Sequence, residues 1–155
     1  MEINAYNSEE YIKAHNKMKE EVLLPDDIIL MKEITDEVNR FPTVTVADDL
    51  VEMESRLATL SFKLAGLVGR LSSQHEVRSK MLKNDMADYA KSLVVEGKEK
   101  SATRAEIAAE TEFFSRRVEN EVFCGVVDEY KGKAYALKDV FLALTHRIHK
   151  FNKNI

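Results

Sequence analysis

The sequence predicts an all-α fold of elongated helices that pack as helical hairpins in a coiled-coil-like manner and form an oligomer. Pro and Gly are scarce, at 2 and 5 of 155 residues, so the chain has little of the turn chemistry that β-hairpins need. Apolar residues also recur at helical spacing along most of the chain. The length fits one domain.

The first helices are predicted from their start and stop signals. Ser8, followed by two glutamates, has the pattern of an N-cap with an acidic first turn and predicts a short helix through about Glu21. Pro25 suits the first position of a second helix, which Pro42 ends near Arg40.

Charge and composition divide the chain into two parts. Residues 1–56 hold 14 Asp and Glu against 6 Lys and Arg, whereas residues 57–155 hold 13 against 17. The β-prone residues 43–46 are too few for a strand and are interpreted as a linker. We therefore predict an acidic N-terminal helical arm, residues 1–42, and a helical domain, residues 43–155, that binds nucleic acid and oligomerises. An acidic head on a basic body suggests a polyanion partner, although an ordinary solvated helix surface explains it too.

A leucine-rich stripe is the strongest signal for the third helix. It alternates steps of three and four residues, as in a coiled coil: Leu50, Met53, Leu57, Leu60, Leu64, Leu67 and Leu71. The stripe lapses from Ser72 to Lys80 and resumes out of phase at Leu82. One helix with a shifted face and two helices with a hinge at residues 72–78 both fit this pattern.

The last part of the chain predicts a loop and a long helix. Residues 96–100 have loop composition, and Thr103 with Glu106 matches a capping box. A continuous helix from there would span about 50 residues, or ~75 Å. We expect its apolar stripe to meet other copies of the chain, because a helix of this length cannot be covered by one small globule.

No catalytic apparatus is recognisable. The sequence has no Gly-rich phosphate loop, Cys-x-x-Cys pair or nucleophile elbow, so we expect no enzyme and no cofactor. His146 and His149 lie three residues apart, a spacing that can hold a metal. They lack a third ligand nearby, and surface histidines near a helix C-terminus are the better interpretation, so no metal site is predicted.

We expect a cytoplasmic protein that does not span a membrane. No apolar run approaches the ~20 residues of a membrane span, and the N-terminal residues do not resemble a signal peptide. Cys124 is the single cysteine and cannot form an internal disulfide, which favours a reducing compartment. We predict that it is a small buried thiol.

Basic residues interleaved with an aromatic suggest a nucleic-acid site on the third helix. Cations along a path with an aromatic for base stacking are what sequence-tolerant single-strand binding needs: Arg70, Arg78, Lys80, Lys83, Tyr89 and Lys91. The alternative is that Tyr89 belongs to the core and that the lysines are simply solvated. Further basic groups follow in the last helix: Arg116, Arg117, Lys131, Lys133, Lys138, Arg147, Lys150 and Lys153.

Several short segments, in their order along residues 45–151, resemble phage recombination mediator proteins of the UvsY type. The segment from Leu82 to Tyr89 is similar to the Leu-Lys…Asp-Tyr stretch that this family uses for DNA binding. Ser101-Ala102 then opens a long helix with Phe123-Cys124-Gly125, and the run from Lys131 to Val140 resembles the family's basic segment near its C-terminus.

The resemblance implies a ring-like homo-oligomer that binds single-stranded DNA, remodels its complex with single-strand-binding protein and helps load a RecA-like recombinase in the host cytoplasm. It implies DNA contacts by Lys83 and Tyr89, supported by Lys80 and Lys91, and an assembly surface on the last helix: Leu137, Phe141, Leu144, Ile148 and Phe151. Asn84-Asp85 departs from the basic residue that the family favours there. The alternative is a structural helical assembly or adaptor protein of a phage with no nucleic-acid role.

Overall fold

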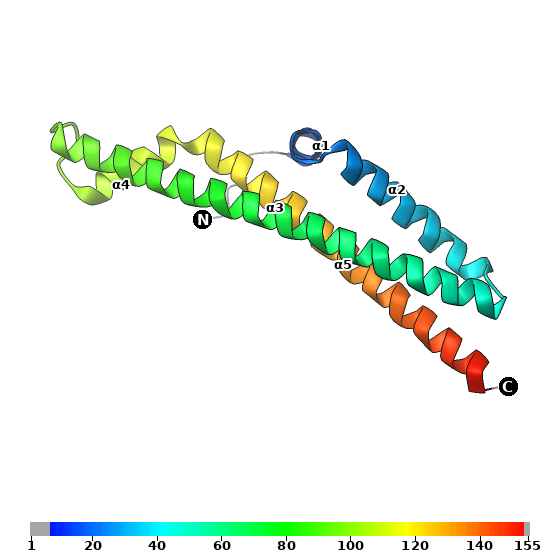
Figure 1. The fold of residues 1–155 in the computed structure, drawn as a ribbon. Helices are drawn as coiled ribbons and strands as arrows, with labels where there is room; N and C mark the ends of the chain where they lie inside the picture. Colours follow the sequence, from blue (N-terminus) through cyan, green and yellow to red (C-terminus); the bar gives the residue numbers. More distant parts are fainter. Residues whose placement is uncertain (1–6, 154–155) are drawn as a thin grey trace. The chain divides into compact units, whose positions relative to one another are not determined.

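The computed structural model describes residues 7–153, which form five α-helices and one 3-10 turn and contain no strand. The elements are α1 (Ser8–Val22), α2 (Pro25–Arg40), η1 (Phe41–Thr43), α3 (Ala47–Val95), α4 (Ala102–Glu112) and α5 (Phe114–Lys153). The predicted all-α class is therefore confirmed (Figure 1). The first six residues of the predicted N-terminal arm lie outside the described residues.

The two N-terminal helices begin close to the predicted positions. The Glu10 N–H donates to Asn7 Oδ1 at 2.9 Å, and the Asn7 N–H donates to Glu10 Oε2 at 3.2 Å. The cap of α1 is thus Asn7 rather than Ser8, which is the first helical residue. α2 has the predicted limits, with Pro25 in its first turn.

α3 is one continuous helix of 49 residues, so the alternative with a hinge at residues 72–78 is wrong. It ends in the predicted loop, where Gly97 has a φ of 71°, a left-handed conformation that glycine adopts without strain. The Lys98 N–H donates back to the Leu93 carbonyl at 2.9 Å. This turn ends α3 and leads the chain into α4.

The predicted long C-terminal helix is interrupted once. Ser101, rather than Thr103, caps α4, because its hydroxyl accepts from the Arg104 N–H at 3.2 Å. Phe113 then leaves helical geometry, with φ −95° and ψ 18°, before α5 begins. The 40 residues of α5 follow without a further break.

The contacts divide the chain into two compact units. Unit 1 contains the residues up to 21 and residues 72–127, and unit 2 contains residues 22–71 and those from 128 onward. Both α3 and α5 therefore contribute one half to each unit. The predicted boundary at residue 42 rested on Pro42 and the linker at residues 43–46 together with the charge asymmetry, whereas the packing assigns α1 to unit 1 and α2 to unit 2.

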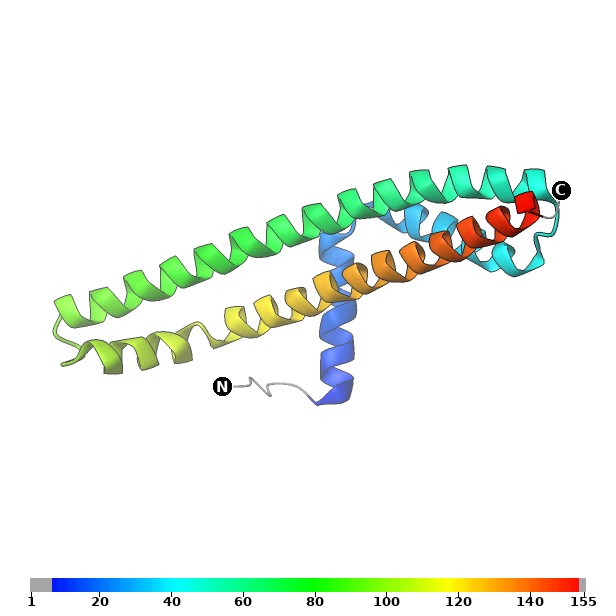
Figure 2. The same cartoon turned by 90° about the horizontal axis from the view of Figure 1, so that it is seen from below.

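In unit 2, α2, the first half of α3 and the second half of α5 lie side by side (Figures 1 and 2). All seven residues of the leucine stripe through Leu71 are buried, with at most 8% of any side chain exposed. α2 contributes Leu30 and Ile34 to the buried residues, and α5 contributes Leu137 and Leu144. Each fully buried leucine stabilises the fold by about 2 kcal/mol.

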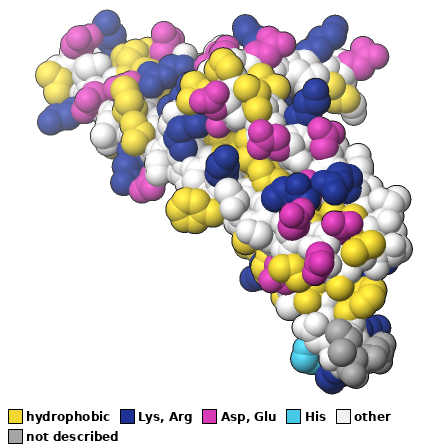
Figure 3. Space-filling view, turned by 45° about the vertical axis from the view of Figure 1, so that its right-hand side comes forward, with side chains coloured by type: hydrophobic (Ala, Val, Ile, Leu, Met, Phe, Trp, Pro, Cys, Tyr) yellow, Lys and Arg dark blue, Asp and Glu magenta, His cyan; other side chains and the backbone are white. Residues whose placement is uncertain are grey.

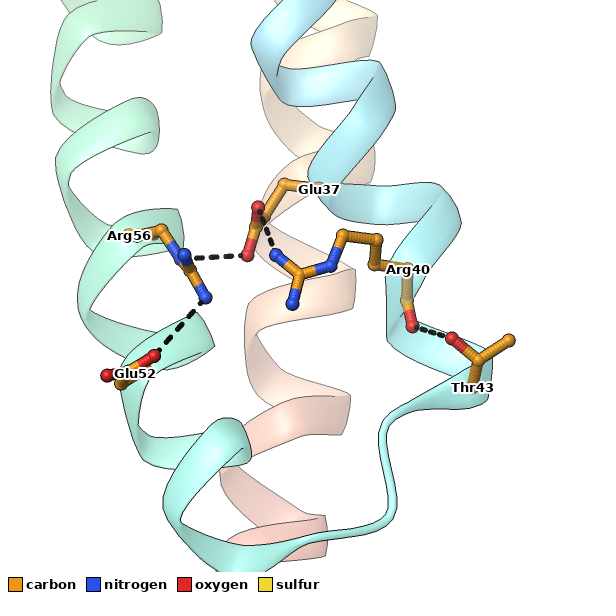
Figure 4. A network of polar contacts seen from close by, with 5 residues as sticks. All are labelled: Glu37, Arg40, Thr43, Glu52 and Arg56. Atoms are coloured by element: carbon orange, nitrogen blue, oxygen red, sulfur yellow. Dashed lines mark hydrogen bonds and ion pairs between the residues drawn. The ribbon is translucent and has the colours of Figure 1, made fainter.

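Ion pairs join α2 to α3 at one end of unit 2 (Figure 4). The buried Glu37 carboxylate lies between two arginines, with Oε1 at 3.2 Å from Arg56 Nε and Oε2 at 3.3 Å from Arg40 Nη1. Arg56 also meets Glu52 at 3.6 Å. The acidic side chains of α2 are thus partly used to bind its own neighbour, α3.

In unit 1, the second half of α3 runs antiparallel to α4 and the beginning of α5. The Arg116 guanidinium donates to Asp85 at 2.8 Å, and the Asn120 amide donates to the Ser79 hydroxyl at 3.0 Å. α1 crosses α5 in the view of Figure 2. It approaches α5 so closely that a Cβ on Gly125 would collide with the Tyr11 hydroxyl.

Cys124 is exposed, so its predicted burial is wrong. Its neighbours Phe123 and Val126 take the buried positions of this turn. The apolar residues around Cys124 in the sequence predicted burial, but the helical phase of α5 places the thiol on the opposite side.

Candidate nucleic-acid interface

Arg70, the first of the predicted DNA contacts, forms a structural ion pair in unit 2. Both of its terminal nitrogens donate to the Asp27 carboxylate, and the Nη1–Oδ1 distance is 3.2 Å. Asp27 is buried and also accepts from the Leu24 N–H at 2.7 Å, at the start of α2. Arg70 thus fixes the beginning of α2 on α3 instead of facing solvent as a free cation.

The pKa values of Asp27 and of Tyr130 both differ from their ordinary values. Burial alone would raise the pKa of Asp27, but the hydrogen bonds from Arg70 and Leu24 outweigh it and lower the pKa below its usual value. Burial, reinforced by the negative charges of Glu129 and Asp27, raises the pKa of Tyr130 to about 12. Asp27 is therefore ionised and Tyr130 neutral at physiological pH.

Tyr89 packs in unit 1 and is not an open stacking platform. Its ring meets Phe113 edge-on with centroids 5.7 Å apart, and it covers the apolar cluster that contains Ala90 and Leu93. The Phe113 ring also lies under the Arg116 guanidinium at 5.4 Å. The core alternative for Tyr89 is the one that the structure supports.

Arg78 and Lys80 are exposed but have neighbours within unit 1. The Arg78 guanidinium lies over the Phe123 ring at 4.9 Å and contacts Met18 Sδ at 3.8 Å. The Lys80 ammonium meets Glu76 at 2.9 Å in an exposed pair, which salt and water screen strongly. Both cations, which were predicted to meet phosphates, are thus partly neutralised or packed within the protein.

Lys83 and Lys91 are the two predicted contacts that stay exposed and make no ion pair within residues 7–153. Both line one hollow between α3 and α4. Exposed acids stand close to them in sequence, at Asp85 and Asp88 on the same helix. The structure therefore brings together two of the six predicted DNA contacts, without the aromatic.

A second basic surface lies on the second half of α5, in unit 2. Residues 131–153 contain six Lys and Arg but only one acid, Asp139. Seven exposed residues of this segment form what we call the basic face, in which successive members are three, four or seven residues apart except for the adjacent His149 and Lys150: Lys131, Tyr135, Lys138, Leu142, His149, Lys150 and Lys153. All seven are exposed, and none of the lysines makes an ion pair within residues 7–153.

Tyr135 stands out on the basic face, because 70% of it is exposed. Leu142, two turns further along, is 50% exposed. An exposed aromatic between lysines can stack on a base while the cations meet phosphates. On the surface shown in Figure 3, Lys and Arg side chains are interspersed with Asp and Glu side chains.

Other cations of the same helix serve the packing of unit 2. Lys133 lies over the Tyr130 ring at 5.2 Å. The Arg147 guanidinium donates to the Phe41 carbonyl at 3.0 Å and lies 5.4 Å from its ring. The helical phase thus separates the basic residues of α5 into an inner set that packs and an outer set that faces solvent.

The predicted assembly stripe is largely covered by its own chain. Leu137 and Leu144 are buried, Phe141 and Ile148 are half-buried, and only Phe151, at 37%, is exposed. The premise that one chain cannot cover this stripe is wrong, because α2 and α3 lie against it in unit 2. A second copy that met this helix would find mainly its outer residues.

His146 and His149 lie on the exposed side of α5. Within residues 7–153, no three side chains of His, Cys, Asp or Glu come together in a way that could hold a metal ion. None of the described helices is long and apolar enough to cross a membrane.

Comparisons with protein-family models, with curated proteins and with solved structures found no match to this chain.

Proposed function

We propose that this chain binds single-stranded DNA through the basic face of α5. The observation that carries the proposal is the exposed Tyr135 between Lys131 and Lys138, on a face with four lysines in a segment, residues 131–153, whose one acid is Asp139. Stacking on an aromatic contributes about 1–3 kcal/mol per base, and every base offers a π-face. The expected binding is therefore strong for unpaired bases and tolerant of sequence.

The proposed biological role is that of a recombination mediator. Such a protein remodels DNA coated by single-strand-binding protein and helps load a RecA-like recombinase, here in the host cytoplasm. The resemblance of the segment Lys131–Val140 supports this role, and this segment lies at the beginning of the basic face. Assembly into a homo-oligomeric ring would link several weak sites and increase avidity. We propose a binding protein without catalytic activity.

A titration of fluorescent oligonucleotides tests the binding directly. The protein is added to single-stranded and duplex DNA of equal length, and anisotropy is measured at low and at near-physiological salt. We expect tighter binding to the single strand and an affinity that falls with salt, because phosphate contacts release counterions. No binding at low salt, or equal affinity for both forms, would contradict the proposal.

A structural assembly or adaptor protein is the second candidate. The observation that favours it is a hollow in unit 1 that is open to solvent and has five alanines in its lining. An adaptor needs such a docking surface but no affinity for DNA. Failure of the DNA titration would therefore favour this candidate.

A further inference from the structure

The hollow in unit 1 lies between the end of α3 and the whole of α4, which form a hairpin (Figures 1 and 2). Its volume is about 680 Å³. The apolar lining consists mainly of small side chains, among them Ala87, Ala90, Ala102, Ala105 and Ala109. We call this surface the alanine groove. Small residues let another helix approach closely, near the lower end of the 8–10 Å range of interaxial distances.

The groove is built on a packed base but is open above. Ala105 and Ala109 are fully buried against Ala90 and Leu93 of α3. Above them Val94, at 42%, and Ala87 are exposed to solvent. An apolar surface of this kind is stabilised when a partner covers it.

The two rims of the alanine groove carry opposite charges. On α3 the rim has Lys83 and Lys91, and on α4 it has Glu106 and Glu110. All four side chains are exposed and make no ion pair within the described part of the chain. The rim cations and the rim carboxylates are therefore available to a partner.

This charge pattern is self-complementary under two-fold symmetry. The two lysines lie on α3 and the two glutamates on α4, so each side of the groove carries charges of one sign. A two-fold axis parallel to the helices keeps each level but exchanges the two sides of the groove. The lysine side of one copy then faces the glutamate side of its partner, as in an isologous interface.

We propose that the alanine groove is the contact surface of a symmetric dimer of this chain. α3 of one copy packs antiparallel on α4 of the other, the alanines and Val94 form the apolar centre, and the four charged positions form the rim. This surface is distinct from the apolar stripe of α5, and the inference does not rest on nucleic-acid binding.

Charge reversal with a mixing control tests the dimer. Sedimentation velocity gives the mass and dissociation constant of wild type, of Lys83→Glu/Lys91→Glu and of Glu106→Lys/Glu110→Lys. Each variant alone presents like charges across the groove, and we expect its dissociation constant to rise roughly 10- to 100-fold. A mixture of the two variants restores opposite charges at all four contacts, so it should form a heterodimer with nearly wild-type affinity.

Lys13→Glu/Lys17→Glu is the matched control, because it reverses two exposed lysines of α1 in the same unit. We expect it to dissociate like wild type, and circular dichroism should show unchanged helicity in all variants. Because dimerisation depends on protein concentration, a wild type that stays monomeric at about 100 µM would overturn the proposal. An oligomer that either reversal leaves intact, or that mixing does not restore, would overturn it as well. None of these outcomes depends on whether the chain binds DNA.

Discussion

The basic segment of α3, residues 70–91, and the basic face of α5 differ in what surrounds their cations. On α3, Arg70 is held by Asp27, Lys80 meets Glu76, and Tyr89 packs against Phe113. On α5, four outward lysines make no ion pair within residues 7–153, and the aromatic between them is exposed. A row of cations becomes a binding surface only where the neighbouring elements leave both its charges and its aromatic uncovered.

The largest expected effect comes from reversing charges on the two surfaces in turn. Lys131→Glu/Lys138→Glu/Lys150→Glu should weaken the binding of a short single strand by about 100-fold, because three phosphate contacts become repulsive. Lys80→Glu/Lys83→Glu/Lys91→Glu, the matched variant on α3, should change it by less than about threefold. Anisotropy with an oligonucleotide of about ten nucleotides, which fits one protomer, measures both. If the α3 variant lost more affinity than the α5 variant, the DNA-binding site would lie on α3 instead.

Arg70 provides the second comparison, because it is a cation whose role we assign to stability. Arg70→Ala leaves the buried Asp27 carboxylate without its ion-pair partner and should lower the free energy of unfolding by about 3 kcal/mol. The affinity for single strands should stay unchanged. Urea denaturation and anisotropy measure the two effects, and an affinity loss in a stable variant would contradict our assignment.

The same ion pair gives a pH dependence with a defined sign. The folded state lowers the pKa of Asp27 below its ordinary value of 3.8. The contribution of Asp27 to stability is therefore complete above that value and is lost as pH falls through the lower folded pKa. Asp27→Asn should be less stable than wild type at neutral pH, and it should lack this part of the stability loss in acid. Denaturation measured from about pH 2 to about pH 7 covers the range in which carboxyl groups titrate and tests both expectations.

The two tyrosines should respond to truncation in opposite ways. Tyr135→Ala removes an exposed ring and should weaken single-strand binding by about tenfold with little change in stability. Tyr89→Ala removes a packed ring and should cost about 2 kcal/mol of stability with little change in intrinsic affinity. Thermal denaturation and anisotropy on both variants separate the roles, and an affinity loss confined to Tyr89→Ala would reverse them.

The smallest effects concern two glycines of α5 that differ in their surroundings. Gly125→Ala forces the exposed Tyr11 hydroxyl of α1 to turn away, which should offset the helix-propensity gain and leave the stability within about 0.5 kcal/mol of wild type. Gly132→Ala meets no atom within 4 Å and should stabilise the helix by about 0.5–1 kcal/mol. Equal shifts in the denaturation midpoint would show that α1 does not cover α5 at Gly125.

Periodicity predicted most of the fold but only part of the candidate site. The limits of α2 and the buried stripe through Leu71 followed from spacing and helix signals, because these features are local. The interruption at Phe113 and the burial of Leu137 and Leu144 within one chain could not be predicted, since both depend on which helices pair. A local signal for the basic face was present, because Tyr135 and Leu142 fall outside the apolar stripe of α5.

The most direct measurement of the central claim is ultraviolet cross-linking of a single-stranded oligonucleotide to the wild-type protein, followed by mass spectrometry of the linked peptides. We expect cross-links in the α5 peptide that contains Tyr135 and their loss with Tyr135→Ala. Cross-links confined to the α3 peptide with Tyr89, or no cross-link under conditions where the strand is bound, would contradict it.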